Sequence, residues 1–153
     1  MNYSFKEIMH SDYLDVCKMR SSISVKVRLL TEITSQNPNT WRVVGVTKAA
    51  LRVFEKNDFQ RKSGMGINRS HLVDRNTTYR KLLEDPKRDL NDWWTFYYEN
   101  DKCVFATKSE NMSGGVGDDY IPIDESLGLF RSKGYAWTHR KGVEDEFLRA
   151  LAS

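Results

Sequence analysis

A chain of 153 residues is long enough to bury a substantial hydrophobic core, and most simply it forms one domain, residues 1–153. Its 39% hydrophobic and 12% aromatic content excludes global disorder, and no apolar run approaches the length that spans a bilayer. The first residues lack a secretory signal pattern, and two cysteines are too few for a disulfide framework, so we expect a cytoplasmic protein.

The net charge of +3 is unevenly distributed along the chain. Residues 60–88 contain eight Lys and Arg against three acids, a local charge of +5. Residues 89–125 contain nine Asp and Glu against two Lys, a local charge of −7. A basic segment beside an acidic one is typical of a polyanion-binding face, although solvated loops of opposite sign explain the charges equally well.

The N-terminal third of the chain is expected to be helical. Residues 11–36 predict one long helix, because apolar residues recur at spacings of four, four and three and Pro38 then stops it. Residues 41–46 predict a strand, and Thr47 is the expected N-cap of a helix that continues to about Asn57. A helix-turn-helix is an alternative here, which the glycine-rich segment that follows disfavours. The apolar residues of the first helix are Met19, Ile23, Val27 and Leu30.

Shorter elements are expected in the middle of the chain. Residues 71–73 predict a very short strand, and residues 77–84 predict a helix. The aromatic run 93–98 and the apolar run 103–107 lie on either side of a polar Asn-Asp-Lys turn, a pattern typical of a β-hairpin.

The C-terminal part is expected to complete the sheet and to cover it with a helix. Residues 109–119, rich in Gly, Ser and Asn, are expected to form a loop, and strands are expected near 120–123, 127–130 and 135–137. The last helix takes its apolar face from Val143, Phe147, Leu148 and Leu151. The predicted fold class is α+β: N-terminal helices, an antiparallel sheet with a central hairpin, and a closing C-terminal helix.

The stretch from Gly64 to Arg75 carries the main functional signal. It places His71 between Arg69 and Arg75, directly after a loop punctuated by two glycines. An imidazole serves as a general base near neutral pH, and arginines hold phosphate groups through paired hydrogen bonds. The alternative is a histidine hydrogen-bonded within the sheet, with arginines that only solubilise the surface. The residues expected to contact nucleic acid are Arg61, Lys62, Asn68, Arg75, Arg80 and Lys81.

The sequence Asn-Arg-Ser-His-Leu at 68–72 resembles the Arg-x-His-Leu segment of the ββα-metal nucleases, the His-Me finger or HNH-like superfamily, and especially their non-specific DNA/RNA branch. In that superfamily the histidine activates water, an asparagine on a later helix helps to bind one divalent metal, and an arginine contacts the phosphate. The resemblance implies that His71 is the catalytic base, Arg69 the phosphate contact and Mg²⁺ or another divalent cation the cofactor. The asparagines implied for the metal site are Asn100 as ligand, Asn91 as an orienting residue and Asn111 as a substitute ligand.

Three further features, an aromatic run, a group of acids and a second histidine, have structural as well as functional explanations. Aromatic residues of 93–98 alternate across the expected strand, so one face belongs to the core while the other is free to stack on unpaired bases. The acids Asp118, Asp119, Asp124 and Glu125 are interpreted as a solvated loop, because a magnesium nuclease of the PD-(D/E)xK type needs a lysine soon after its second acid. His139 is interpreted as a surface histidine at the entry to the last helix.

Together these patterns favour a metal-dependent endonuclease that hydrolyses phosphodiester bonds of nucleic acid, with DNA as the favoured substrate and a restriction or phage-defence role. A non-catalytic nucleic-acid-binding module that uses the same basic face is the first alternative. A protein–protein regulator that uses the acidic 89–125 segment is the second. No membrane partner is expected, and a homodimer is left open.

Overall fold

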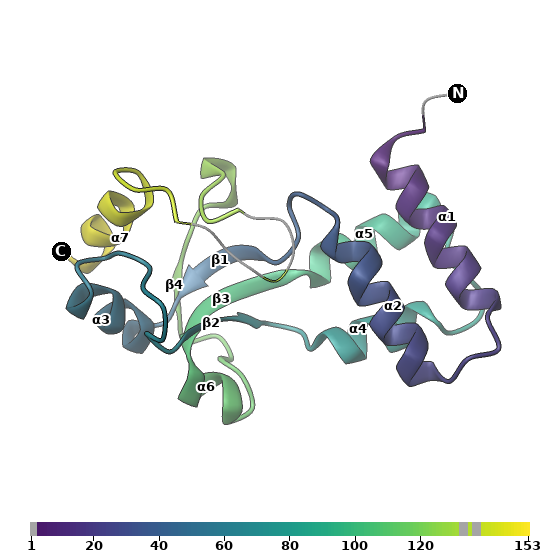
Figure 1. Ribbon diagram of the computed structural model, residues 1–153, viewed down its shortest axis with the longest axis horizontal. Coiled ribbons are helices and arrows are strands. Elements are labelled where there is room, and N and C mark those ends of the chain that lie inside the picture. The colour runs from purple at the N-terminus through teal and green to yellow at the C-terminus, as the bar shows by residue number, and fades with distance from the viewer. Residues whose placement is uncertain (1–2, 132–134, 136–138) are drawn as a thin grey trace.

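The computed structural model describes residues 3–131, 135 and 139–153, which form an α+β fold (Figure 1). Within these residues the helices and strands follow one another in this order: α1 (Phe5–Lys18), α2 (Ile23–Ser35), β1 (Arg42–Val46), α3 (Lys48–Lys56), β2 (Ile67–His71), α4 (Arg75–Leu82), α5 (Leu90–Asn100), β3 (Lys102–Thr107), α6 (Lys108–Met112), β4 (Ile121–Pro122), a 3-10 turn η1 (Glu125–Leu127) and α7 (Glu144–Ala152).

A four-stranded sheet in the order β2-β3-β1-β4 lies at the centre of the fold (Figure 1). β1 and β3 are parallel, whereas β2 and β4 pair antiparallel with their neighbours. α3 and α7 lie at one end of the sheet, and α1, α2, α4 and α5 form a helical layer at the other end. Two clusters of buried side chains follow this division, one around Phe54 and Phe105 and one around Tyr13 and Trp93.

The predicted α+β class, the N-terminal helices and the closing C-terminal helix are confirmed. The strand expected at 41–46 is β1, whose five residues are all buried. Thr47 caps α3 as expected, since its hydroxyl accepts a hydrogen bond from the Ala50 N–H at 3.0 Å. The strand expected near 120–123 is the two-residue β4. The sheet itself is mixed rather than antiparallel, because β1 and β3 run in the same direction.

The single helix predicted over residues 11–36 is wrong, because the segment forms two helices. α1 begins earlier, at Phe5, with a capping box in which Ser4 and Glu7 satisfy each other's backbone N–H groups. It ends at Lys18, and Ser22 then caps α2. The apolar periodicity continues across the break, so the spacing alone does not reveal it, whereas the two serine caps do.

The hairpin predicted from 93–98 and 103–107 is also wrong, because residues 93–98 belong to the helix α5. Asp89 starts this helix by accepting hydrogen bonds from the N–H groups of Asn91 and Asp92. Trp93 and Tyr97 lie four residues apart on one helical face, and both are fully buried in the helical layer. The Trp93–Tyr97 face of the helix is therefore core, the rings of Trp94, Phe96 and Tyr98 are partly buried, and β3 pairs with β2 and β1 instead.

The remaining short elements differ in extent. β2 begins at Ile67 rather than at residue 71, and α4 spans Arg75–Leu82 rather than 77–84. The strand expected near 127–130 is replaced by the η1 turn, which ends at Gly128 in a left-handed conformation. Tyr135 is not in a strand, and residues 136 and 137 of the last expected strand lie outside the described residues.

Candidate functional site

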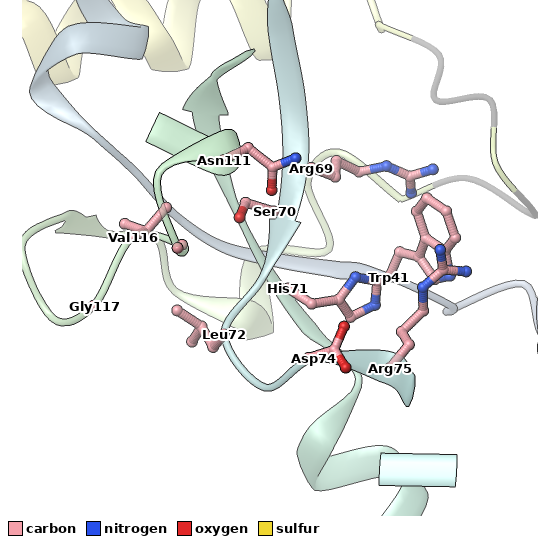
Figure 2. A pocket seen from close by; sticks show the side chains of 12 residues that line it. Trp41, Arg69, Ser70, His71, Leu72, Asp74, Arg75, Asn111, Val116 and Gly117 are labelled. Carbon is pink, nitrogen blue, oxygen red and sulfur yellow. The ribbon is translucent and has the colours of Figure 1, made fainter. Parts of the chain in front are cut away.

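His71 stands at the end of β2, where the strand leaves the sheet and turns toward α4. Its side chain lines a pocket of about 510 Å³ that opens between the sheet, the start of α4 and the loop after α6. Figure 2 shows Trp41 and Arg75 on one side of His71 and Asn111 and Val116 on the other. The other side chains and backbone of the wall come from Arg69, Ser70, Leu72, Asp74, Gly114, Gly115 and Gly117.

Asp101, which lies between α5 and β3, is the partner of His71. The distance from His71 Nε2 to Asp101 Oδ1 is 3.1 Å, and the two side chains are only 10% and 3% exposed. The Oδ2 atom of Asp101 accepts three more hydrogen bonds, from the Trp41 N–H, the Thr40 hydroxyl and the Tyr97 hydroxyl. The carboxylate therefore has donors at both oxygens although it is buried.

These hydrogen bonds decide the charge of Asp101. Burial by itself raises the pKa of the carboxyl, but the hydrogen bond and charge of His71 and the bonds from Trp41 and Thr40 outweigh it, so the pKa lies below its ordinary value. An ionised carboxylate only accepts hydrogen bonds, so Nε2 of His71 carries a hydrogen. In the neutral imidazole Nδ1 is then the nitrogen that accepts a proton, as a general base must.

Trp41 packs against the charged groups of the pocket wall. Its indole ring lies edge-on to the imidazole of His71, with the ring centres 5.2 Å apart. The guanidinium carbons of Arg69 and Arg75 lie 4.8 Å and 4.4 Å from the indole centre, so cation–π attraction offsets the repulsion between two neighbouring cations. The φ angle of Trp41 is +54°, a left-handed conformation that is costly for a bulky residue and is held by the N–H bond to Asp101.

The two arginines have different environments. Arg69 is 8% exposed and donates from Nη2 to the Tyr135 carbonyl at 3.0 Å. Burial lowers its pKa to about 10, so it remains charged at neutral pH. Arg75, the first residue of α4, is half-buried and also lies over the ring of Tyr135. The pocket wall thus holds two positive charges beside the His71–Asp101 pair.

The structure places the implied asparagines differently from the expectation. Asn100 lies at the end of a helix rather than in a hairpin turn, and its amide nitrogen donates to the Phe96 carbonyl at 2.8 Å. It lies beside Thr78 and Asp101 and does not line the His71 pocket. Asn91 lies at the opposite end of α5, where its side chain accepts a hydrogen bond from Lys6. Neither asparagine is brought to His71.

Asn111, the substitute ligand, does line the His71 pocket. It belongs to α6, which follows β3 directly and begins with a capping box formed by Thr107 and Glu110. β2 and β3 are antiparallel neighbours, so β2, β3 and α6 together make a strand–strand–helix unit, into which α4 and α5 are inserted. Figure 2 shows the Asn111 side chain across from Arg69, above Ser70.

The pocket offers oxygen ligands for a divalent cation, though few of them. In residues 3–131, 135 and 139–153, no three His, Cys, Asp or Glu side chains gather to hold a metal ion by themselves. The lining oxygens belong to Asn111, Ser70 and Asp74, and Oδ2 of Asp74 already accepts hydrogen bonds from Thr77. This donor set fits Mg²⁺, which in phosphate-processing sites keeps several waters and takes only one or two protein ligands in addition to the phosphate.

The other basic residues do not form one continuous face. Arg61 and Lys62 are exposed on the loop before β2, and Arg61 lines a cavity of about 290 Å³ with Gln60, His139 and Lys141. Arg80 and Lys81 are exposed on α4, in the helical layer at the other end of the sheet. Asn68 lies between these groups on β2 and is half-buried.

Several carboxylates of the acidic segment 89–125 have partners within the fold, and six of the nine are exposed. Asp101 is buried, Glu125 pairs with Arg42, and Glu99 pairs with Lys102. Asp89, Glu110 and Asp124 cap helices or turns. Local pairing and capping therefore engage part of this acidic segment, while Asp118 and Asp119 are exposed.

Sequence reasoning identified His71 and both arginines but missed Asp101 and Trp41. The sequence pattern places Asp101 in a hairpin turn and Trp41 at the start of a strand. No local signal joins either residue to His71, because both contacts span 30 residues along the chain and arise only when the strands pair.

Comparisons with family models, with curated proteins and with solved structures found no match to this chain. In the part of the chain that the structure describes, no helix has both the length and the apolarity required to cross a bilayer.

Proposed function

We propose that this protein is a metal-dependent endonuclease that hydrolyses phosphodiester bonds of nucleic acid, with DNA as the favoured substrate. The observation that carries the proposal is the His71–Asp101 pair, held at 3.1 Å in the wall of a pocket that also contains two arginines. A histidine fixed by a carboxylate is the usual arrangement of a general base, and guanidinium groups are the usual partners of a phosphate.

In this proposal His71 removes a proton from the attacking water through Nδ1. Asp101 holds the ring through Nε2–H and stabilises the imidazolium that forms. Asp101 acts through His71 and is therefore a positioning residue. Its own position is fixed by Tyr97 and Thr40, which tie the site to the core of the helical layer.

Arg75 makes the direct phosphate contact in this proposal. Arg69 is more deeply buried and already donates to the Tyr135 carbonyl, so its main contribution is a fixed positive charge beside the bound phosphate. Trp41 keeps the two guanidinium groups side by side, which reduces the reorganisation required when the phosphate arrives.

Asn111 is the residue that would hold the divalent cation, with water and phosphate oxygens completing its coordination. When bound, such a cation neutralises charge on the phosphate and on the leaving oxygen. The strand–strand–helix unit of β2, β3 and α6 supports the resemblance to the ββα-metal nucleases, since it brings a helix asparagine and a strand histidine to one pocket.

A cytoplasmic setting and a restriction or phage-defence role remain parts of this proposal. The two cysteines, Cys17 and Cys103, are both free thiols, as a reducing compartment maintains them.

The test is the nicking of supercoiled plasmid with Mg²⁺ or Mn²⁺. We expect the intact protein to nick the plasmid and His71→Gln to be slower by roughly 10²–10⁴-fold, the range that general-base catalysis contributes. His10→Gln is the matched control, because His10 lies on α1 and bonds the Arg88 carbonyl, away from the pocket. Plasmid retention without nicking by any of the three proteins would instead identify a non-catalytic binding module.

A further inference from the structure

Helix α4 starts at the mouth of the His71 pocket and leads away from it. Its N-cap Asp74 and its first residue Arg75 both line the pocket. The helix then continues along the helical layer, next to α2 and α5 (Figure 1). A phosphate held in the pocket would therefore lie beside the start of α4, and the rest of the helix would extend away from it.

The two faces of α4 have different chemistry. Thr78, Tyr79 and Leu82 are buried and pack into the helical layer. The outward face contains no carboxylate and no aromatic ring within the bounds of the helix. Its exposed residues are Asn76, Thr77, Arg80 and Lys81, which recur at helical spacing and so share one face.

The two cations of this face are not neutralised within the fold. In the described part of the chain neither Arg80 nor Lys81 forms an ion pair, whereas Arg88 and Lys102, at the ends of α5, pair with carboxylates of that helix. Arg80 donates from Nε to the Asn76 side-chain oxygen at 2.9 Å. This bond orients the guanidinium and leaves its two terminal amino groups for a ligand.

We propose that this exposed face of α4 binds double-stranded nucleic acid in its major groove, beside the phosphate held in the His71 pocket. The inference rests on the proposed nuclease function and specifies its substrate as a duplex. A helix of eight residues is about 12 Å long and fits a B-form major groove, where asparagine and arginine pair with base edges and lysine with phosphates.

A single strand is the less suitable ligand. Binding of unpaired bases relies on aromatic side chains that offer open ring faces. α4 presents none on its outward face. On the neighbouring α5 the rings of Trp93 and Tyr97 are fully buried, and those of Trp94, Phe96 and Tyr98 are partly buried. The exposed groups of α4 are instead hydrogen-bonding and cationic, which suits a paired duplex.

The test measures binding of a short mixed-sequence duplex and of its separated strand, without divalent cations, as a function of salt. Arg80→Ala with Lys81→Ala removes both cations from exposed positions. For the duplex we expect roughly tenfold weaker binding, and a slope of log K against log salt that is smaller by about one, because Lys81 is the cation assigned to a phosphate. The matched control is Lys48→Ala with Arg52→Ala on α3, an equal change in charge from two exposed positions.

Three outcomes would overturn the inference: equal losses in the α4 and α3 variants, equal losses for duplex and single strand, or no loss in the α4 variant. Groove contact is checked separately by replacing guanine with 7-deazaguanine, which removes a major-groove acceptor and should weaken the intact protein more than the α4 variant. These measurements do not depend on cleavage. If the intact protein binds plasmid without nicking it while the α4 effect holds, the nuclease proposal fails and the duplex surface stands.

Discussion

At the scale of single residues, the site depends on a buried carboxylate with four hydrogen-bond donors. Asp101 accepts from His71, Trp41, Thr40 and Tyr97, residues that come from three separate places in the sequence. The donors reach the carboxylate from β2, from the segment before β1 and from α5. Such a network fixes the ring of His71 and the left-handed backbone of Trp41 at the same time.

Asp101→Asn should lower the rate of nicking while leaving duplex binding without metal nearly unchanged. Asparagine has the same shape, but it removes the charge that stabilises the imidazolium. Its NH2 group is also a hydrogen-bond donor, placed where Asp101 accepts four hydrogen bonds. We expect the turnover rate to fall by roughly 10²–10⁴-fold, similar to the loss of the base itself. The measurement is plasmid nicking together with the dissociation constant of a duplex.

Thr40→Val is the matched control, because it deletes one hydrogen bond to the far oxygen of Asp101 and keeps the charge. It should reduce the rate far less than Asp101→Asn. Equal rates in the two variants, or a parallel loss of duplex binding, would show that Asp101 has only a structural role.

At the scale of elements, α5 decides the architecture of the site. Its C-terminal end delivers Asp101 to His71, and its buried face anchors the helical layer through Trp93 and Tyr97. The aromatic run suits a strand as well as a helix by composition. The N-cap Asp89 and the buried pair four residues apart favour the helix.

Asp89→Ala should therefore destabilise the protein by about 1 kcal/mol, because two backbone N–H groups lose their acceptor. The measurement is urea unfolding followed by far-UV circular dichroism. Glu99→Ala, at the exposed other end of the same helix, should stay within about 0.5 kcal/mol of the intact protein. If the two variants are equally stable, Asp89 is not a helix cap.

At the scale of the whole molecule, the half-buried His139 and the buried Asp101 make stability depend on pH on the acid side. Burial is the largest cause of the lowered pKa of His139, partly opposed by the charges of Glu144 and Asp145 and assisted by that of Arg61. The unfolded chain therefore takes up this proton first, below the ordinary value of 6.5. The lowered pKa of Asp101 changes stability in the same direction at lower pH, because the stabilisation that it gives is lost below the ordinary value of 3.8.

We expect His139 to leave the free energy of unfolding unchanged above pH 6.5. As the pH falls from 6.5 to the lowered pKa of this residue, the free energy of unfolding should decline. A second decline follows below pH 3.8, when Asp101 is protonated. Urea unfolding at a series of pH values checks both. His139→Gln should flatten the upper decline and leave the lower one, and an unchanged upper decline would show that His139 does not cause it.

The sequence by itself determined the features that depend on neighbouring residues. Thr47 caps α3 where the local pattern places it, β1 follows from a short apolar run, and the closing helix from its apolar face. The segment around His71 also stood out as the functional candidate, because its two arginines and two glycines are adjacent in the chain. Periodicity, caps and local charge are short-range properties, so they can be recognised in a single sequence.

Only the tertiary structure decided the features that depend on residues far apart in the chain. It made a helix of the aromatic run, because Trp93 and Tyr97 pack with α1 and α2 rather than with a sheet partner. It brought Asp101 and Asn111 to His71, and left Asn91 and Asn100 away from it, because the pairing of β2 with β3 determines which side chains meet. Strand register is set by the packing of the whole sheet, so the partners of His71 are a property of the fold.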